Sequence, residues 1–180
     1  SRKNPVETFA GHIFARQNPL ALNFRCGRDH HHGIDALLAA ALVQHGLSRG
    51  APPASGLRRP AAAAVAAASV ALAGGAAARF RAQHTTVEPF DPSKASSLVV
   101  SGPNSRTRNP MYVAMAGLLA ANALRRGSWL GVLPVAAFVA VIDRFQVAAE
   151  ERALAERFGA DYETYRASVP RWLDARSVRR

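Results

Sequence analysis

The sequence predicts an all-α protein: a polytopic membrane helical bundle of about four transmembrane helices, with a cytoplasmic C-terminal helical extension. Three observations lead to this fold class. Four apolar stretches of helical length follow one another from Ile34 onward. These stretches are apolar on all sides, so they lack the polar stripe of a soluble amphipathic helix. Basic residues bracket nearly every stretch, as they do at membrane interfaces.

The four stretches cover residues 34–47, 60–78, 111–124 and 129–142. Pro60 suits the first turn of the second helix, and Gly127 follows two arginines at the end of the third. A spanning helix needs roughly 20 apolar residues, and several stretches are shorter. Trp129 stands at the edge of the fourth stretch, where interfacial aromatic residues are expected. We therefore expect each stretch to be a membrane helix.

The chain is long enough for one well-cored domain, which we place at residues 34–173. Residues 1–33 have no helical or strand period, and we interpret them as an unpacked tail, native or added for expression. His30, His31 and His32 point in different directions along such a tail, and no carboxylate or thiolate pattern completes a site, so we predict no metal. Residues 174–180 are interpreted as a basic C-terminal tail.

The net charge of +11 indicates an anionic partner: nucleic acid, a membrane surface or an acidic substrate. The basic residues bracket apolar stretches and few aromatics interleave with them, which favours membrane lipids over nucleic acid. If both termini are cytoplasmic, 18 of the 23 Lys and Arg residues lie on the cytoplasmic side. The positive-inside rule favours this orientation. Because the composition is rich in Ala and Arg, as in many bacterial proteins, we expect a bacterial inner membrane.

Two polar regions on the predicted cytoplasmic side contain the candidate site residues. In the first, Arg108 stands directly before the third stretch, and Asn109-Pro110 favours a turn at the entry of its helix. In the second, Glu150 and Glu151 border the apolar stripe of a helix that continues the fourth stretch. By pattern alone, Arg108 could be a snorkelling interfacial arginine and the glutamates could belong to a solvated helix face.

Taken together, the polar motifs resemble those of the isoprenylcysteine carboxyl methyltransferase-like and phospholipid methyltransferase family. The resemblance covers residues 60–172 and depends on the order and spacing of several short motifs. They are Gly102-Pro103, Thr107-Arg108-Asn109-Pro110-Met111-Tyr112, Glu150-Glu151-Arg152-Ala153-Leu154, Phe158-Gly159, Tyr162, Tyr165 and Val169-Pro170-Arg171-Trp172. The chain departs from the family's usual pattern at Asn104, Ser105 and Ala114, which lie near the expected pocket and bear on the choice of substrate.

The resemblance implies a membrane enzyme that uses S-adenosyl-L-methionine and methylates a small-molecule or lipid acceptor. The positions that match cofactor-binding motifs are Gly102, Pro103, Arg108, Asn109, Pro110, Tyr112, Glu150 and Glu151. A methionine-derived zwitterion offers a carboxylate for Arg108 and an ammonium for one of the two glutamates. We expect Arg108 and Arg171 to take the catalytic roles, Arg171 by holding an anionic group of the acceptor.

Two other functional classes remain compatible with the sequence. A nicotinamide-dependent membrane reductase of the sterol or steroid type is similar in its C-terminal half, but the chain has no Gly-x-Gly-x-x-Gly motif. A non-catalytic membrane interaction protein would account for the apolar stretches and would leave Arg108 and the glutamates without a role.

Overall fold

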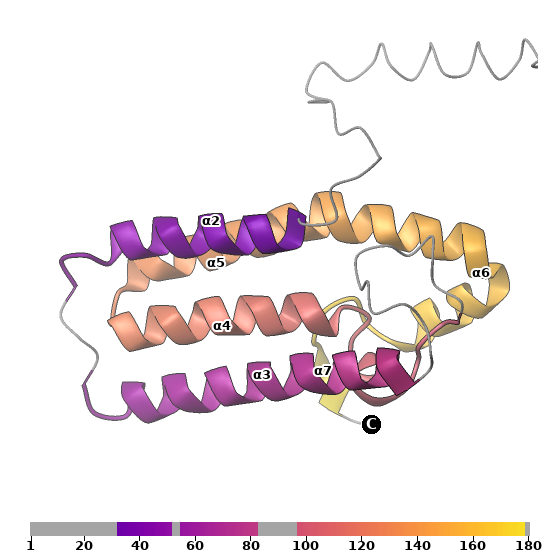
Figure 1. The fold of residues 1–180 in the computed structure, drawn as a ribbon, viewed down its shortest axis with the longest axis horizontal. Coiled ribbons are helices and arrows are strands. Elements are labelled where there is room, and N and C mark those ends of the chain that lie inside the picture. The colour runs from indigo at the N-terminus through magenta and orange to yellow at the C-terminus, as the bar shows by residue number, and fades with distance from the viewer. Residues whose placement is uncertain (1–31, 52–54, 83–96, 179–180) are drawn as a thin grey trace, which may run out of the picture.

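The computed structural model describes residues 32–51, 55–82 and 97–178. These residues form helices and connecting loops, with no strand among them (Figure 1). The all-α prediction is confirmed for this part of the chain. The predicted N-terminal tail lies outside the described residues except for its last two, His32 and Gly33, which form the start of a helix.

The helices follow the predicted apolar stretches closely. Helix α2 spans His32–Leu47, α3 spans Arg58–Ala82 and α4 spans Pro110–Arg126. The fourth stretch starts as the 3-10 turn η3 (Trp129–Gly131) and continues as α5 (Val132–Val141), the π-helix η4 (Ile142–Val147) and α6 (Ala148–Ser168). A 3-10 turn, η2 (Gly102–Ser105), precedes α4, and a short helix, α7 (Ala175–Val178), ends the described chain.

Helices α2, α3, α4 and α5 lie side by side along the long axis of the molecule, and α6 extends beyond one end of this bundle (Figure 1). Helix α4 contacts the other three helices, and α2 also contacts α5. Large side chains fill the centre, among them Tyr112, Met115, Leu119, Phe138 and Ile142. The first turn of α4 and the start of α6 therefore meet at the same end of the bundle.

Two helical segments are long and apolar enough to cross a membrane: Arg58–Ala82 and the continuous stretch Trp129–Ser168. They account for two of the four predicted transmembrane helices. Helix α2 is apolar but has 16 residues, about 24 Å of helix against a hydrocarbon core of about 30 Å. Large apolar side chains are nevertheless exposed on the outer surface of the bundle, including Leu42, Val70, Val132 and Leu133. A surface of this kind suits lipid contact.

Beyond the bundle, α6 bends back at Gly159, whose φ of 50° and ψ of −122° lie outside the helical range. The bend lets Tyr162, Tyr165 and Val169 form a second buried cluster. The chain after this cluster packs on the loop before α4, where the buried Ser177 donates a hydrogen bond to the carbonyl oxygen of Arg106 at 2.6 Å. Residues 175–178, which the sequence pattern placed in the basic tail, thus form α7 against this loop.

Candidate functional site

The loop before α4 places the first predicted motif. Gly102 has a φ of 64°, and a Cβ at this position would lie 2.9 Å from Nε of Arg79, so only glycine fits here without a shift. The amide groups of Arg106 and Thr107 then donate to the carbonyl oxygen of Pro103. Gly102 and Pro103 shape this turn against α3, where Gly102 lies beside Arg79 and Pro103 lies beside Gly75.

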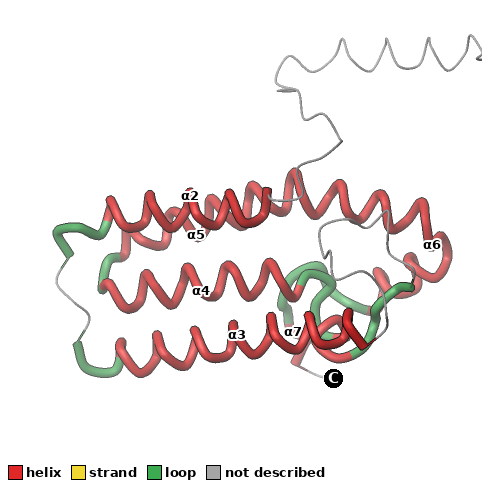
Figure 2. The backbone as a smooth tube through the Cα atoms, viewed as in Figure 1, coloured by secondary structure: helices red, strands yellow, loops and turns green. Residues whose placement is uncertain are grey.

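A second segment, residues 169–172 after α6, lies against the loop that leads into α4 (Figure 2). The amide of Arg108 donates to the carbonyl oxygen of Pro170 at 2.9 Å, and Thr107 Oγ1 donates to that of Arg171 at 2.9 Å. Asn109 Nδ2 donates to the same Arg171 carbonyl at 3.1 Å. Asn109 therefore fastens the C-terminal segment to the entry of α4, where Pro110 begins the helix.

Arg108, Glu151 and Arg171 form an ion-pair cluster at this end of the bundle. Arg108 Nη2 lies 2.7 Å from Glu151 Oε1, and the two side chains are only 9% and 10% exposed. Arg171 contacts the same carboxylate with two nitrogens, Nε at 3.0 Å from Oε1 and Nη2 on Oε2. A bidentate arginine–carboxylate pair of this kind is among the strong hydrogen-bonded contacts in proteins. Residues from three separate parts of the sequence thus meet on one carboxylate.

Arg171 also reaches Asp143, which lies in the π-helix η4. Arg171 Nη1 is 3.1 Å from Asp143 Oδ1, and the indole Nε1 of Trp172 donates to the same oxygen at 2.7 Å. Its hydrogen bond to Glu151 raises the pKa of Arg171 above its usual value, and Asp143 adds to this effect. The guanidinium therefore stays charged between two carboxylates.

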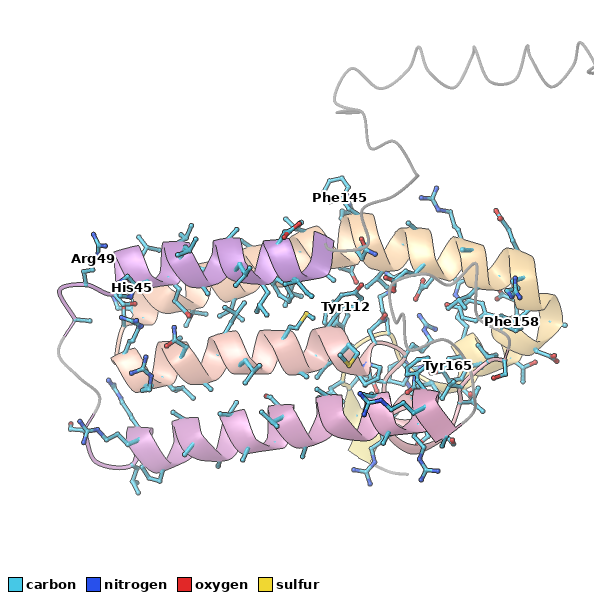
Figure 3. The ribbon with its side chains drawn as sticks, viewed as in Figure 1. His45, Arg49, Tyr112, Phe145, Phe158 and Tyr165 are labelled. Atoms are coloured by element: carbon cyan, nitrogen blue, oxygen red, sulfur yellow. The ribbon has the colours of Figure 1, made fainter. Side chains whose placement is uncertain are left out.

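Tyr112 and Glu150 form the other half of the site. The hydroxyl of Tyr112 donates to Glu150 Oε1 at 2.6 Å, and Gln146 Nε2 donates to the same oxygen at 2.8 Å. Tyr112 lies in the first turn of α4, at the α6 end of the bundle, whereas His45 and Arg49 lie at the other end (Figure 3). Tyr112 thus packs in the bundle core and places its hydroxyl at the start of α6.

The charges and unpaired atoms of this cluster suit a zwitterionic or cationic ligand. Two guanidiniums (Arg108 and Arg171) face three carboxylates (Asp143, Glu150 and Glu151), which leaves one formal negative charge. Nε of Arg108 is buried and has no hydrogen-bond partner in the described part of the chain. A buried donor left unsatisfied costs about 1–3 kcal/mol, which a ligand acceptor at this atom would recover.

The structure brings together most of the residues predicted from the sequence: Arg108, Asn109, Tyr112, Glu150, Glu151 and Arg171. Pro110 lies beside them as the first residue of α4. Sequence reasoning missed Asp143 and Gln146 and gave Trp172 no role. A signal was present, because Asp143 and Gln146 precede Glu150 by seven and four residues and so share its helix face.

A family model described as phospholipid methyltransferase matches residues 58–161, more than half of the chain. The chain belongs to the phospholipid methyltransferase family. This confirms the resemblance inferred from the motifs, and the matched range contains Arg108, Tyr112, Asp143, Glu150 and Glu151. Family membership and the two apolar helical segments together indicate a membrane-associated methyltransferase.

Part of this chain is similar to a protein of Haemophilus influenzae (strain ATCC 51907 / DSM 11121 / KW20 / Rd) that is described as uncharacterized. The two are 41% identical over 63 residues, which are 35% of this chain and the whole of that protein. No solved structure matches this chain significantly.

Proposed function

We propose that this chain is an integral membrane methyltransferase that transfers a methyl group from S-adenosyl-L-methionine to a carboxylate, thiol or lipid acceptor at the cytoplasmic interface. The observation that carries the proposal is the meeting of the family's two motif regions on one cluster. Arg108 and Tyr112 from the entry of α4 contact Glu151 and Glu150 from the start of α6. The two glutamates lie in α6 and Arg108 lies directly before α4, so this cluster forms only where the two segments pack together.

The cluster supplies complementary groups for the polar end of this cofactor, whose sulfonium carries the transferable methyl group. The buried guanidinium of Arg108 suits the cofactor carboxylate through its unsatisfied Nε. Glu150 and Glu151 suit the ammonium, because a carboxylate forms strong charge-assisted hydrogen bonds with it. Since Glu151 already pairs with Arg108 and Arg171, an ammonium at Glu151 shares that carboxylate with the two arginines.

Catalysis by these residues consists mainly of positioning. Methyl transfer from a sulfonium is an in-line displacement, and holding the reacting groups aligned can contribute roughly 7–11 kcal/mol. The described residues of the cluster include no histidine, which favours an acceptor that is already ionised, such as a carboxylate or a thiolate. Arg171 is one-third exposed beside the buried pair and is placed to hold an anionic acceptor group.

Calorimetry on the detergent-purified protein tests the proposal. We expect S-adenosylhomocysteine to bind and NADPH not to bind. Binding of NADPH without S-adenosylhomocysteine would favour the membrane reductase instead. If neither compound binds at millimolar concentration, the protein is better explained as a non-catalytic membrane interaction protein.

Arg171→Lys tests the role of Arg171 separately, because lysine keeps the charge but cannot hold two carboxylates in a fork. We expect KM for an anionic acceptor to rise more than the Kd for S-adenosylhomocysteine. Arg176→Lys is a matched control on the exposed pair with Asp174. If the two substitutions change KM for the acceptor equally, Arg171 does not contact the acceptor.

A further inference from the structure

We propose that the opposite end of the bundle holds a second binding site, in which Arg59 and Arg125 bind the headgroup of an anionic phospholipid. This inference rests on the proposed membrane location and is independent of methyl transfer. The site lies in a groove between α3 and α4, at the end where His45 and Arg49 are seen (Figure 3) and away from the Glu151 cluster.

The groove has a volume of about 550 Å³. Its floor is apolar, and its lining residues are Arg59, Ala62, Ala63, Ala66, Leu118, Ala121, Asn122 and Arg125. Because α3 and α4 run in opposite directions, the start of α3 and the end of α4 place the two arginines at the same end of the groove. The seven-residue step from Arg59 to Ala66 corresponds to about 10 Å along the helix.

The inner end of the groove is closed by close packing of the two helices. Gly117 faces Ser69 so tightly that a Cβ at position 117 would collide with the Ser69 hydroxyl. The remaining opening leads outward and toward the helix ends, since Arg59, Ala63, Leu118 and Arg125 are all exposed. An acyl chain can therefore enter from the lipid side and lie along the alanines.

A polar network connects the exposed Arg125 to the buried Gln44. Arg125 Nη2 donates to Asn122 Oδ1 at 2.9 Å, and Asn122 Nδ2 donates to Oε1 of Gln44. Gln44 is fully buried and donates to the carbonyl oxygens of Leu119 at 2.9 Å and Gly131 at 2.8 Å. The methyltransferase site uses none of these residues. A guanidinium oriented in advance loses less side-chain freedom when it binds a ligand.

The charge of the groove indicates which kind of lipid binds there. The eight lining residues include two arginines and no acidic residue, so the mouth of the groove is positive. Guanidinium groups match phosphate oxygens in geometry and charge. The apolar floor extends from these arginines toward the middle of the bundle, in the direction an acyl chain would take from its headgroup. A phospholipid with net negative charge satisfies both parts of the groove.

The test compares retention of phosphatidylglycerol and phosphatidylcholine with identical acyl chains, measured by quantitative lipid mass spectrometry after detergent washing. We expect the wild-type protein to retain phosphatidylglycerol preferentially. The double substitution Arg59→Gln/Arg125→Gln should reduce this preference by roughly tenfold or more, because each arginine contributes separately to anionic-lipid binding. Its Kd for S-adenosylhomocysteine should stay unchanged, which separates this test from that of the proposed enzyme.

The control is Arg49→Gln/Arg58→Gln, which removes the same charge from the same end but outside the groove lining. If this control reduces the preference as strongly, diffuse positive charge explains the result and the proposal is overturned. Ala66→Phe fills the groove floor and keeps both arginines. It should also lower phosphatidylglycerol retention, and unchanged retention would overturn the placement of the acyl chain. Melting temperatures in lipid-free detergent verify that each variant is folded.

Discussion

Glu151 is the residue on which the candidate site depends most, because two guanidiniums share its carboxylate. Its side chain is nearly buried, so solvent screens these contacts weakly. Removing its charge leaves Arg108 and Arg171 facing a neutral amide. The breaking of a buried pair commonly costs about 3–5 kcal/mol, more than the loss of an exposed pair.

We predict that Glu151→Gln weakens S-adenosylhomocysteine binding by roughly 10-fold to 150-fold, the equivalent of about 1.5–3 kcal/mol for a charge-assisted bond. Calorimetry measures the change directly. The matched control is Glu156→Gln, since Glu156 lies on the same helix but is exposed, and its affinity should change less than about twofold. Intact binding in both variants would contradict the cofactor role of Glu151, and the melting temperature of Glu151→Gln separates lost binding from lost fold.

At the scale of a helical element, the π-helix η4 places Asp143 and Gln146 toward the site. π-helical turns are uncommon and occur often at functional sites. Asp143 contacts both Arg171 and Trp172, and Gln146 contacts Glu150, so one turn supports both halves of the cluster. This segment follows directly after the apolar helix α5 and joins the bundle to α6.

Asp143→Asn tests this supporting role. Asparagine can still accept the hydrogen bond of Trp172 but loses the charge that pairs with Arg171. We expect KM for the methyl acceptor to rise about 2-fold to 5-fold, as for a partly exposed ion pair, with a smaller change in cofactor Kd. The control is Arg144→Gln, which changes the exposed residue next to Asp143. Its steady-state kinetics should match those of the wild type. If Kd for the cofactor rises while KM for the methyl acceptor does not, Asp143 supports cofactor binding instead.

The bend in α6 depends on Gly159, whose positive φ disfavours side chains. Gly159→Ala should lower the free energy of unfolding by about 1–3 kcal/mol through backbone strain, although the space around the residue is open. Thermal unfolding in detergent measures this change, and a stabilised Gly159→Ala variant would contradict backbone strain at Gly159.

Gly74→Ala is expected to have the opposite effect, because Gly74 lies within α3 with open space around it. Alanine at this position should raise the free energy of unfolding by about 0.5–1 kcal/mol, which the same thermal unfolding measures.

At the scale of the whole molecule, apolar and charged surfaces are separated. Exposed Leu and Val side chains cover the bundle, whereas the outer face of α6 carries Arg152, Glu156 and Asp161. The Glu151 cluster lies at the junction of these two surfaces. This arrangement suits an enzyme whose bundle lies in lipid and whose site meets the aqueous interface.

We predict that the protein sediments with membranes and requires detergent for extraction, because so small a bundle cannot bury all its apolar residues. Sodium carbonate and high salt should leave it in the pellet, and detergent should release it. A peripheral protein held by its positive charge would behave differently, since salt weakens that attraction. Release by carbonate or salt alone would therefore contradict integral insertion.

The sequence alone was enough to predict the four helical stretches, since hydrophobic runs and their Pro and Gly boundaries are local features. Pro110 begins α4 and Gly127 ends it, as the pattern predicts. The family motifs likewise identified Arg108, Tyr112, Glu150 and Glu151 as one group of residues. Two of the four predicted transmembrane helices lie in segments that are long and apolar enough to cross a bilayer, and the other two stay predictions, because their apolar stretches are shorter than the roughly 20 residues that a spanning helix needs.

Only the tertiary structure decided which charges pair. Arg171 lies 20 residues after Glu151 and 28 after Asp143, and nothing in the local pattern of its segment predicts that it binds both carboxylates. The pairing depends on the bend at Gly159, which returns the chain to the entry of α4. The polar network from Gln44 through Asn122 to Arg125 depends in the same way on helices that are far apart in sequence. Helix formation follows from near neighbours, whereas the polar partners of a site depend on how the helices pack.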